Sequence, residues 1–325
     1  MAVKDEVLAF LENNKGLAVS GEEIAGELGV TRNSVWKAIK SLKAEGYVIE
    51  GVTNRGYTLI DSKDILSAQS IRKYIKKAQD CQIIIMSTVD STNNEAKSLA
   101  AKGAGEWTVV ISEEQTAGKG RLGKRFSSPG KTGIYMSIVL RPAFSAADSL
   151  AITTAAAVAV ARGVEDISKR KTQIKWVNDV FMDNLKICGI LTEASMSFES
   201  GGLEYAVLGI GINVKRPEGG FPPELEGIAG AVYDTECGDE TRSRIIAGVL
   251  DRFYECYVNL PDKGFLEEYR KRSMLTGKTI EFTAGGEPGT GVVEDIDGNA
   301  GLVVRLASGE LKTFTSGEIT LKKRF

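Results

Sequence analysis

GKGRLGKRFSSPG, residues 118–130, matches two phosphate-binding patterns and completes neither. Its glycines give the G-x-G-x-x-G of a dinucleotide-binding fold. Residues 118–124 also give the G-x-x-x-x-G-K of a P-loop, but Arg125 stands where a P-loop has Ser or Thr. Both patterns need a helix directly after the glycines, and the serine, proline and glycine residues of segment 127–133 break a helix. The segment therefore excludes both nucleotide-binding folds and predicts a mobile, irregular loop.

This loop carries four cations and no acid, a composition suited to closing over an anionic ligand. A solvated basic hairpin loop is the alternative interpretation, and the loop alone does not decide between them. The cations are Lys119, Arg121, Lys124 and Arg125.

Mixed α and β patterns flank the loop on both sides. Apolar runs such as CQIIIM (81–86) and GIYMSIVL (133–140) predict strands, and an alanine-rich stretch at about 148–166 predicts a helix. The runs VFM and KICGILTEAS predict a hairpin that turns at Asp183 and Asn184. The remaining predicted elements are a helix in STNNEAKSLAA, strands in WTVVIS, TQIKW and EYAVLGIGINV, and helices at about 241–257 and 264–272.

Polar residues stand where some of these elements meet. DSTN (90–93) lies between a strand and a helix, where hydroxyl, amide and helix N–H groups either bind a carbonyl or anion or simply cap the helix. KWVND (175–179) surrounds the end of a strand, and Lys186 follows on the next hairpin. Lysine neutralises phosphate oxygens, and a carboxylate such as Asp179 holds Mg2+ or accepts a proton. GIGIN (209–213) indicates either close approach of a flat ligand or a β-bulge.

The first 60 residues predict a winged helix-turn-helix. A helix at 4–13 precedes a second helix with a capping box at Ser20 and Glu23, and a third helix capped by Thr31 buries Val35, Ile39 and Leu42. A hairpin follows around residues 53–56. A trihelical protein-interaction module is the alternative. The residues expected to face DNA are Arg32, Asn33, Lys37 and Lys40 on the third helix and Arg55 at the hairpin tip.

The composition restricts the chemistry further. The 325 residues include 41 basic and 43 acidic residues, so contact with nucleic acid requires a local basic patch. The chain has no histidine, which excludes Ser-His-Asp catalysis, Cys-His catalysis and histidine-ligated metals. Its four cysteines form no C-x-x-C pair, which favours a reducing compartment. Since no apolar stretch is long enough to span a bilayer, we predict a cytoplasmic protein without membrane contact.

Five motifs occur in the order and approximate spacing of biotin protein ligases: STN, QTAGKGRLGK, KWVND, KICGILTE and GIGIN. With the winged helix in front, the whole chain resembles the bifunctional biotin ligases that also repress biotin genes. The resemblance implies an α+β protein with a winged-helix DNA-binding domain at 1–62 and a mixed α/β catalytic domain of the biotin/lipoate ligase type at 66–275. A small SH3-like β-barrel would follow at 276–325, where the tail from Lys278 is patterned as strands only.

The resemblance also assigns the site residues. The family loop commonly has arginine at the positions of Lys119, Leu122 and Lys124, and proline is common at the position of Val177. The residues implied for biotin and its adenylate are Ser91, Thr92, Asn93, Gln115, Lys119, Gly120, Arg121 and Lys186; those for the biotin slot are Gly189, Gly209 and Gly211; and those for the nucleotide are Lys175, Asn178 and Asn213.

The implied reaction is the activation of biotin by Mg-ATP to biotinoyl-5′-AMP, followed by transfer to a lysine of a biotin carboxyl carrier protein. Arg121, Lys119 and Lys186 would stabilise the phosphoryl charge, and Asp179 would be the base for the acceptor lysine. No metal ligand is predicted. The adenylate would promote a homodimer that binds operator DNA. Two alternatives are a non-catalytic repressor that senses biotin and a lipoate-type ligase.

Overall fold

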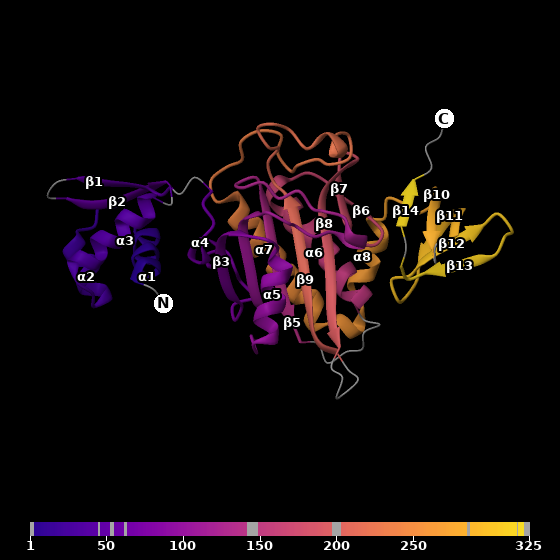
Figure 1. Cartoon of the computed structure of the whole chain (residues 1–325), viewed down its shortest axis with the longest axis horizontal. Helices are drawn as coiled ribbons and strands as arrows, with labels where there is room; N and C mark the ends of the chain where they lie inside the picture. Colours follow the sequence, from indigo (N-terminus) through magenta and orange to yellow (C-terminus); the bar gives the residue numbers. More distant parts are fainter. Residues whose placement is uncertain are drawn as a thin grey trace. The chain divides into compact units, whose positions relative to one another are not determined.

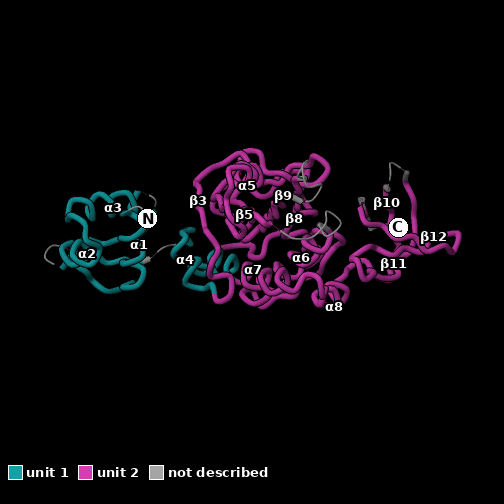
Figure 2. The backbone as a smooth tube through the Cα atoms, turned by 90° about the horizontal axis from the view of Figure 1, so that it is seen from below, with its two compact units in different colours: residues 1–75, 237–247 teal, residues 76–236, 248–325 magenta. Residues whose placement is uncertain are grey.

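The computed structural model describes residues 3–44, 46–52, 55–61, 64–141, 149–196, 203–284, 287–316 and 318–321 (Figure 1). The chain divides into two compact units (Figure 2). Residues 1–75 and 237–247 form unit 1, and residues 76–236 and 248–325 form unit 2. Among the described residues, no helix is both long enough and apolar enough to cross a membrane.

Unit 1 begins with the predicted helix-turn-helix. Helices α1 (Val3–Asn13), α2 (Gly21–Leu28) and α3 (Arg32–Ala44) share one apolar core, to which α3 contributes Val35, Ile39 and Leu42 as predicted. The capping box is confirmed, because Glu23 N donates to Ser20 Oγ at 3.0 Å and Ser20 N donates to the Glu23 carboxylate at 3.4 Å. This local signal fixes the start of α2 without a tertiary contact.

A two-stranded antiparallel wing, β1 (Val48–Val52) and β2 (Gly56–Asp61), follows α3. Gly56 has a φ of +97°, and a Cβ at this position would lie 2.1 Å from the carbonyl oxygen of Val19. Glycine is therefore required where the wing closes onto the chain before α2. The predicted turn residues Thr53 and Asn54 lie outside the described residues.

The rest of unit 1 joins α4 (Ala68–Arg72) to segment 237–247. The Arg242 guanidinium donates to the Asp64 carboxylate at 2.8 Å, and both side chains are nearly buried. The hydroxyl groups of Ser70 and Ser243 lie 2.9 Å apart. Buried polar groups are paired here, as a stable interior requires.

Unit 2 contains a seven-stranded mixed sheet in the order β3-β4-β5-β9-β8-β7-β6. The β3–β4 pair is parallel and the other pairs are antiparallel. The predicted hairpin turn is confirmed, because Asp183 and Asn184 join β7 and β8 with positive φ values of 49° and 62°. The strands are β3 (Gln82–Val89), β4 (Thr108–Gln115), β5 (Gly133–Leu140), β6 (Gln173–Lys175), β7 (Asp179–Met182), β8 (Leu185–Met196) and β9 (Leu203–Asn213).

Helices pack against this sheet. Helix α5 (Thr92–Ala101) contacts β4, β5 and β9, and the alanine-rich α6 (Ser149–Ser168) contacts β6, β7, β8 and β9. Small residues let α6 lie close to its neighbours, because a Cβ at Gly163 would approach Val249 Cγ2 to 2.7 Å. The last helices are α7 (Thr241–Val258) and α8 (Phe265–Lys271), close to their predicted bounds.

The tail forms the predicted small β module, a five-stranded antiparallel sheet in the order β13-β12-β11-β10-β14. It is tied to the KWVND segment, because Trp176 Nε1 donates to the Ala300 carbonyl at 2.8 Å. The predicted α+β class is confirmed in its three parts. The strands are β10 (Thr279–Ala284), β11 (Glu287–Ile296), β12 (Leu302–Leu306), β13 (Leu311–Phe314) and β14 (Glu318–Leu321).

Candidate functional site

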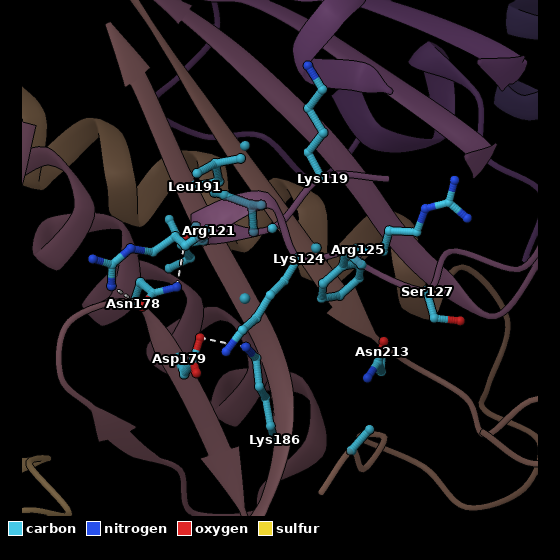
Figure 3. Close-up of a pocket in the computed structure, with 18 of the residues that line it drawn as sticks. Lys119, Arg121, Lys124, Arg125, Ser127, Asn178, Asp179, Lys186, Leu191 and Asn213 are labelled. Carbon is cyan, nitrogen blue, oxygen red and sulfur yellow. Dashed lines mark hydrogen bonds and ion pairs between the residues drawn. The ribbon is translucent and has the colours of Figure 1, made fainter. Parts of the chain in front are cut away.

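A cavity of about 520 Å³ lies in unit 2, lined by the ends of several strands and by the basic loop (Figure 3). It brings together every residue that the sequence predicted for the catalytic domain. Its volume lies in the range of sites for small organic ligands. The predicted residues along it are Ser91, Thr92, Asn93, Gln115, Lys119, Gly120, Arg121, Lys175, Asn178, Asp179, Lys186, Gly189, Gly209, Gly211 and Asn213.

The basic loop is a short irregular hairpin. Phe126 N donates to the Gly118 carbonyl at 2.9 Å, and Gly120 N donates to the Lys124 carbonyl at 2.7 Å. The tip, Arg121–Gly123, is a single 3₁₀ turn in which Leu122 has a positive φ of 55°. The exclusion of a P-loop and of a dinucleotide fold is confirmed, because the described chain runs from this tip into β5 without an α-helix. The predicted mobility of the loop stays a prediction.

Arg121 anchors this loop to the cavity. Its guanidinium donates to Asn178 Oδ1 at 3.0 Å, and Asn178 Nδ2 donates in turn to the Ile190 carbonyl at 3.0 Å (Figure 3). On the other side of the hairpin, Lys119 donates to the side-chain oxygen of Asn94. Two cations of the loop are thereby held by neutral amides, which an anionic ligand can replace.

An ion pair lies deeper in the cavity. Lys186 Nζ lies 2.7 Å from Asp179 Oδ1, and both side chains are partly buried. Figure 3 shows Lys124 pointing toward the same carboxylate. Two lysines thus lie near one carboxylate. Phosphate oxygens of a ligand can attract these lysines away from Asp179.

The polar end of the cavity is a network of hydrogen bonds around the start of α5. Thr92 donates to Gln115 Oε1 through its backbone N at 2.8 Å and its hydroxyl at 3.1 Å. Ser137 Oγ lies 2.6 Å from Asn93 Oδ1 and 2.8 Å from Thr92 Oγ1. Ser91 occupies the N-cap position, as one interpretation of the sequence has it, but its side chain makes no capping bond. The Gln115 side chain accepts the bond from the first helical N–H instead.

Glu193 on β8 anchors this network from the side. It accepts from Asn93 Nδ2 at 2.7 Å and pairs with Lys97. Burial raises the pKa of the Glu193 carboxyl, but the bonds from Asn93 and Lys97 together lower it below its usual range. The sequence included this residue in the KICGILTE motif without assigning it a role; the available signal was that it is the one carboxylate of the motif.

Two glycines of β9 form the floor of the cavity. A Cβ at Gly209 would lie 2.1 Å from Asn93 Oδ1, and a Cβ at Gly211 would lie 2.6 Å from the Phe126 ring. Both positions pair regularly with β5 and β8, so the β-bulge interpretation is wrong. Glycine is needed here because other side chains lie directly on the strand.

Several apolar lining residues were not predicted. Segment 214–230 is poor in periodic signals, but Lys186 N donates to the Ile228 carbonyl at 2.8 Å and thereby fixes the segment over the cavity. Phe126 was visible as the aromatic residue of the basic loop. The unpredicted apolar residues are Leu122, Phe126, Trp176, Phe181, Ile190, Leu191, Ile210, Phe221, Leu225, Ile228, Ala229 and, from the C-terminal module, Ile319.

Metal binding by the protein itself has little support in the described part of the chain, which holds no cluster of three or more Asp, Glu, Cys or His side chains suited to a metal ion. Asp179 and Glu224 are carboxylates along the cavity. One or two carboxylates suffice for Mg2+, which usually keeps water and phosphate ligands. Asp179 therefore fits a magnesium ion that is bound mainly by a nucleotide.

The predicted DNA-facing residues lie in unit 1, and each of them is exposed. The side of α3 opposite its buried residues carries Arg32, Asn33, Lys37 and Lys40. Arg55 directly precedes strand β2 of the wing. The arrangement offers a basic helix face and one cation of the wing, as in helices that enter the major groove.

Three family models match the chain. The model described as an HTH domain matches residues 4–58, the biotin/lipoate A/B protein ligase family matches residues 85–213, and the biotin protein ligase C-terminal domain matches residues 276–322. The matches coincide with the winged helix, the seven-stranded sheet and the C-terminal module.

Curated proteins that are similar to this chain include bifunctional ligase/repressors. A bifunctional ligase/repressor BirA from Bacillus spizizenii is 36% identical over 248 residues, which cover 76% of each chain. The BirA of Escherichia coli is 24% identical over 324 residues, 98% of this chain and 96% of its own length. Among solved structures, the biotin protein ligase from Aquifex aeolicus in complex with biotin and ATP is 25% identical, with a TM-score of 0.63 over 75% of this chain and 99% of that one.

Proposed function

Because the chain belongs to the family of bifunctional biotin protein ligases and repressors, we propose that the cavity of unit 2 makes and holds biotinoyl-5′-AMP. The protein is an ATP-dependent biotin protein ligase and a DNA-binding repressor. The biotin carboxylate attacks the α-phosphorus of ATP and releases pyrophosphate, and a lysine amine then attacks the resulting mixed anhydride and releases AMP. The observation that carries the proposal is the convergence of all the predicted ligase residues on one cavity.

The ureido group of biotin would occupy the polar end, where its N–H and carbonyl groups need acceptors and donors. Thr92, Gln115 and Asn93 present hydroxyl and amide groups whose positions are fixed by neighbours. Gly209 and Gly211 have no side chains that would project from the strand into the cavity. Gly189 and Phe126 border the same floor. Preorganised polar groups on an apolar floor favour one orientation of a small flat ligand.

The phosphoryl group would lie between the basic loop and the ion pair. Arg121 and Lys119 would exchange their amide partners, Asn178 and Asn94, for phosphate oxygens, and Lys186 would approach from the opposite side. Charge that develops on the phosphoryl group during attack is stabilised by such fixed cations. Lys175 and Asn213 border the same cavity and are assigned to the nucleotide.

Asp179 would serve the second half-reaction. A lysine of ordinary pKa, about 10.4, is protonated at neutral pH, so the acceptor amine must lose a proton before it attacks. When Lys186 moves to the phosphate, the Asp179 carboxylate becomes free to accept this proton. Mg2+ bound with ATP would neutralise charge on the phosphates, and we assign Asp179, a carboxylate along the cavity, to hold it.

The proposal extends to partners. The acceptor is a biotin carboxyl carrier protein, and the winged helix binds an operator. A single winged helix makes few base contacts, so we expect the adenylate to promote a homodimer that binds two half-sites. We also expect the reaction to take place in the cytoplasm.

An intact-mass assay tests the enzymatic half. The full chain is incubated with a carrier domain, Mg-ATP and either biotin or lipoate, and the carrier is weighed. Addition of one biotin supports the proposal. Addition of lipoate alone would indicate the lipoate-type ligase, and no addition with either acid would indicate a repressor that only senses biotin.

A further inference from the structure

The exposed face of α3 carries one large apolar side chain among its cations. Trp36 is 51% exposed. Arg32, Trp36 and Lys40 follow one another at intervals of four residues, so they form one line along the helix. The 13 residues of α3 include no acid. An indole therefore lies within the basic face, on the side away from the core.

The indole is held in a defined position. Lys40 Nζ lies 5.4 Å from the centre of the Trp36 ring, within range of a cation–π contact. Leaving this much apolar surface in water is unfavourable, so a partner that covers the indole gains free energy. Since cations surround Trp36, the partner that the charge favours is a polyanion.

The position along the helix selects the kind of contact. Trp36 is the fifth residue of α3, and the first half of a recognition helix is the part that reaches base edges in the major groove. Arginine and lysine pair with phosphates or with guanine, whereas an apolar group has one partner in this groove, the C5-methyl group of thymine.

We propose that Trp36 reads a thymine methyl group in each operator half-site, while Arg32 and Lys40 on either side of it contact DNA through charge. The proposal rests on the DNA-binding part of the proposed function and adds a residue and a base preference to it. Trp36 is a specificity residue here, and the neighbouring lysines supply sequence-independent affinity.

The test uses the full chain with biotin and Mg-ATP. A binding sequence is first selected from random DNA, and each thymine of that sequence is then replaced singly by deoxyuridine, which lacks only the methyl group. Affinities are measured for the wild type and for W36A at fixed salt. We expect W36A to bind the selected site about tenfold more weakly and unrelated DNA equally well. At one thymine per half-site, replacement by deoxyuridine should weaken DNA binding by the wild type but should not change DNA binding by W36A.

Two control variants separate this role from others. L17A removes a side chain in the same unit that is 63% exposed and lies outside the basic face, and it should bind like the wild type. K37A should weaken binding to every sequence and reduce its salt dependence.

Equal losses for W36A on selected and unrelated DNA would overturn the proposal and indicate contact with the sugar-phosphate backbone. Normal DNA binding by W36A would also overturn it and indicate that the indole serves a protein partner. Failure of the wild type itself to bind any DNA would refute the DNA-binding function, a result distinct from either outcome.

Discussion

Replacing Gly209 by alanine tests whether the floor of the cavity is built around Asn93. The new Cβ would lie 2.1 Å from Asn93 Oδ1, 2.9 Å from its Cγ and 3.0 Å from its Nδ2, so the whole amide must move. Asn93 is 4% exposed and is held by Ser137 at 2.6 Å and by Glu193 at 2.7 Å. Moving the amide breaks both bonds and leaves buried polar atoms unsatisfied, at about 1–3 kcal/mol for each group.

We therefore expect G209A to lose roughly 2–4 kcal/mol of catalytic-domain stability and to bind biotin at least about tenfold more weakly. Thermal unfolding with and without biotin measures both effects, and biotin-dependent pyrophosphate release gives the KM for biotin. G105A is the matched control, since its Cβ would meet nothing within 4 Å. Wild-type stability together with a wild-type KM in G209A would refute the role assigned to Asn93 and the floor.

Four further outcomes are expected. Lys186→Ala should slow biotin-dependent pyrophosphate release by about 10²–10³-fold, since it removes a positioned cation; a near-normal rate would contradict the assignment. Arg121→Gly should still form the adenylate but release it, which biotin on bystander lysines of an unrelated protein would reveal; labelling confined to the carrier would count against this role. Deletion of residues 1–60 should abolish operator binding and leave measurable ligase activity, checked by gel shift and by intact mass of the carrier. Burial raises the pKa of Glu165, but hydrogen bonds from Arg272 and Thr172 together lower it, so its carboxylate stabilises the fold above the unfolded pKa of about 4.3 and this contribution is lost as pH falls. Glu165→Gln should therefore lower the melting temperature at pH 7 much more than at pH 4.

The sequence predicted elements whose determinants are local. The capping box at Ser20 and Glu23 and the turn at Asp183 and Asn184 depend on neighbours within a few residues, and the structure has both. The glycine, proline and serine content of the basic loop likewise excluded a helix without knowledge of the fold. The residues around the cavity were predicted through the family resemblance, which covers the chain from its winged helix to its last strands.

Contacts between residues that are distant in the sequence could not be predicted from such local signals. Ile319 reaches the cavity from the C-terminal module, and Phe221 and Ile228 reach it from a segment without helical or strand periodicity. Their positions depend on bonds such as that from Lys186 N to the Ile228 carbonyl, which link residues about 40 positions apart. The interpretation of GIGIN as a bulge failed for the same reason, because Asn93 and Phe126, which lie on its glycines, come from other elements.

The partners of the basic loop determine how a ligand acts on it. Arg121 and Lys119 are each bonded to a neutral amide, Asn178 and Asn94. The amide oxygens offer these cations no opposite charge, whereas a phosphate does, so an adenylate phosphate would replace both amides with a gain in electrostatic attraction. The loop would then be fixed by the ligand from both sides of its hairpin. If dimer formation uses the loop in this fixed state, then biotin with ATP must favour the dimer, and operator DNA that binds the dimer must in turn increase the affinity for the adenylate by the same factor.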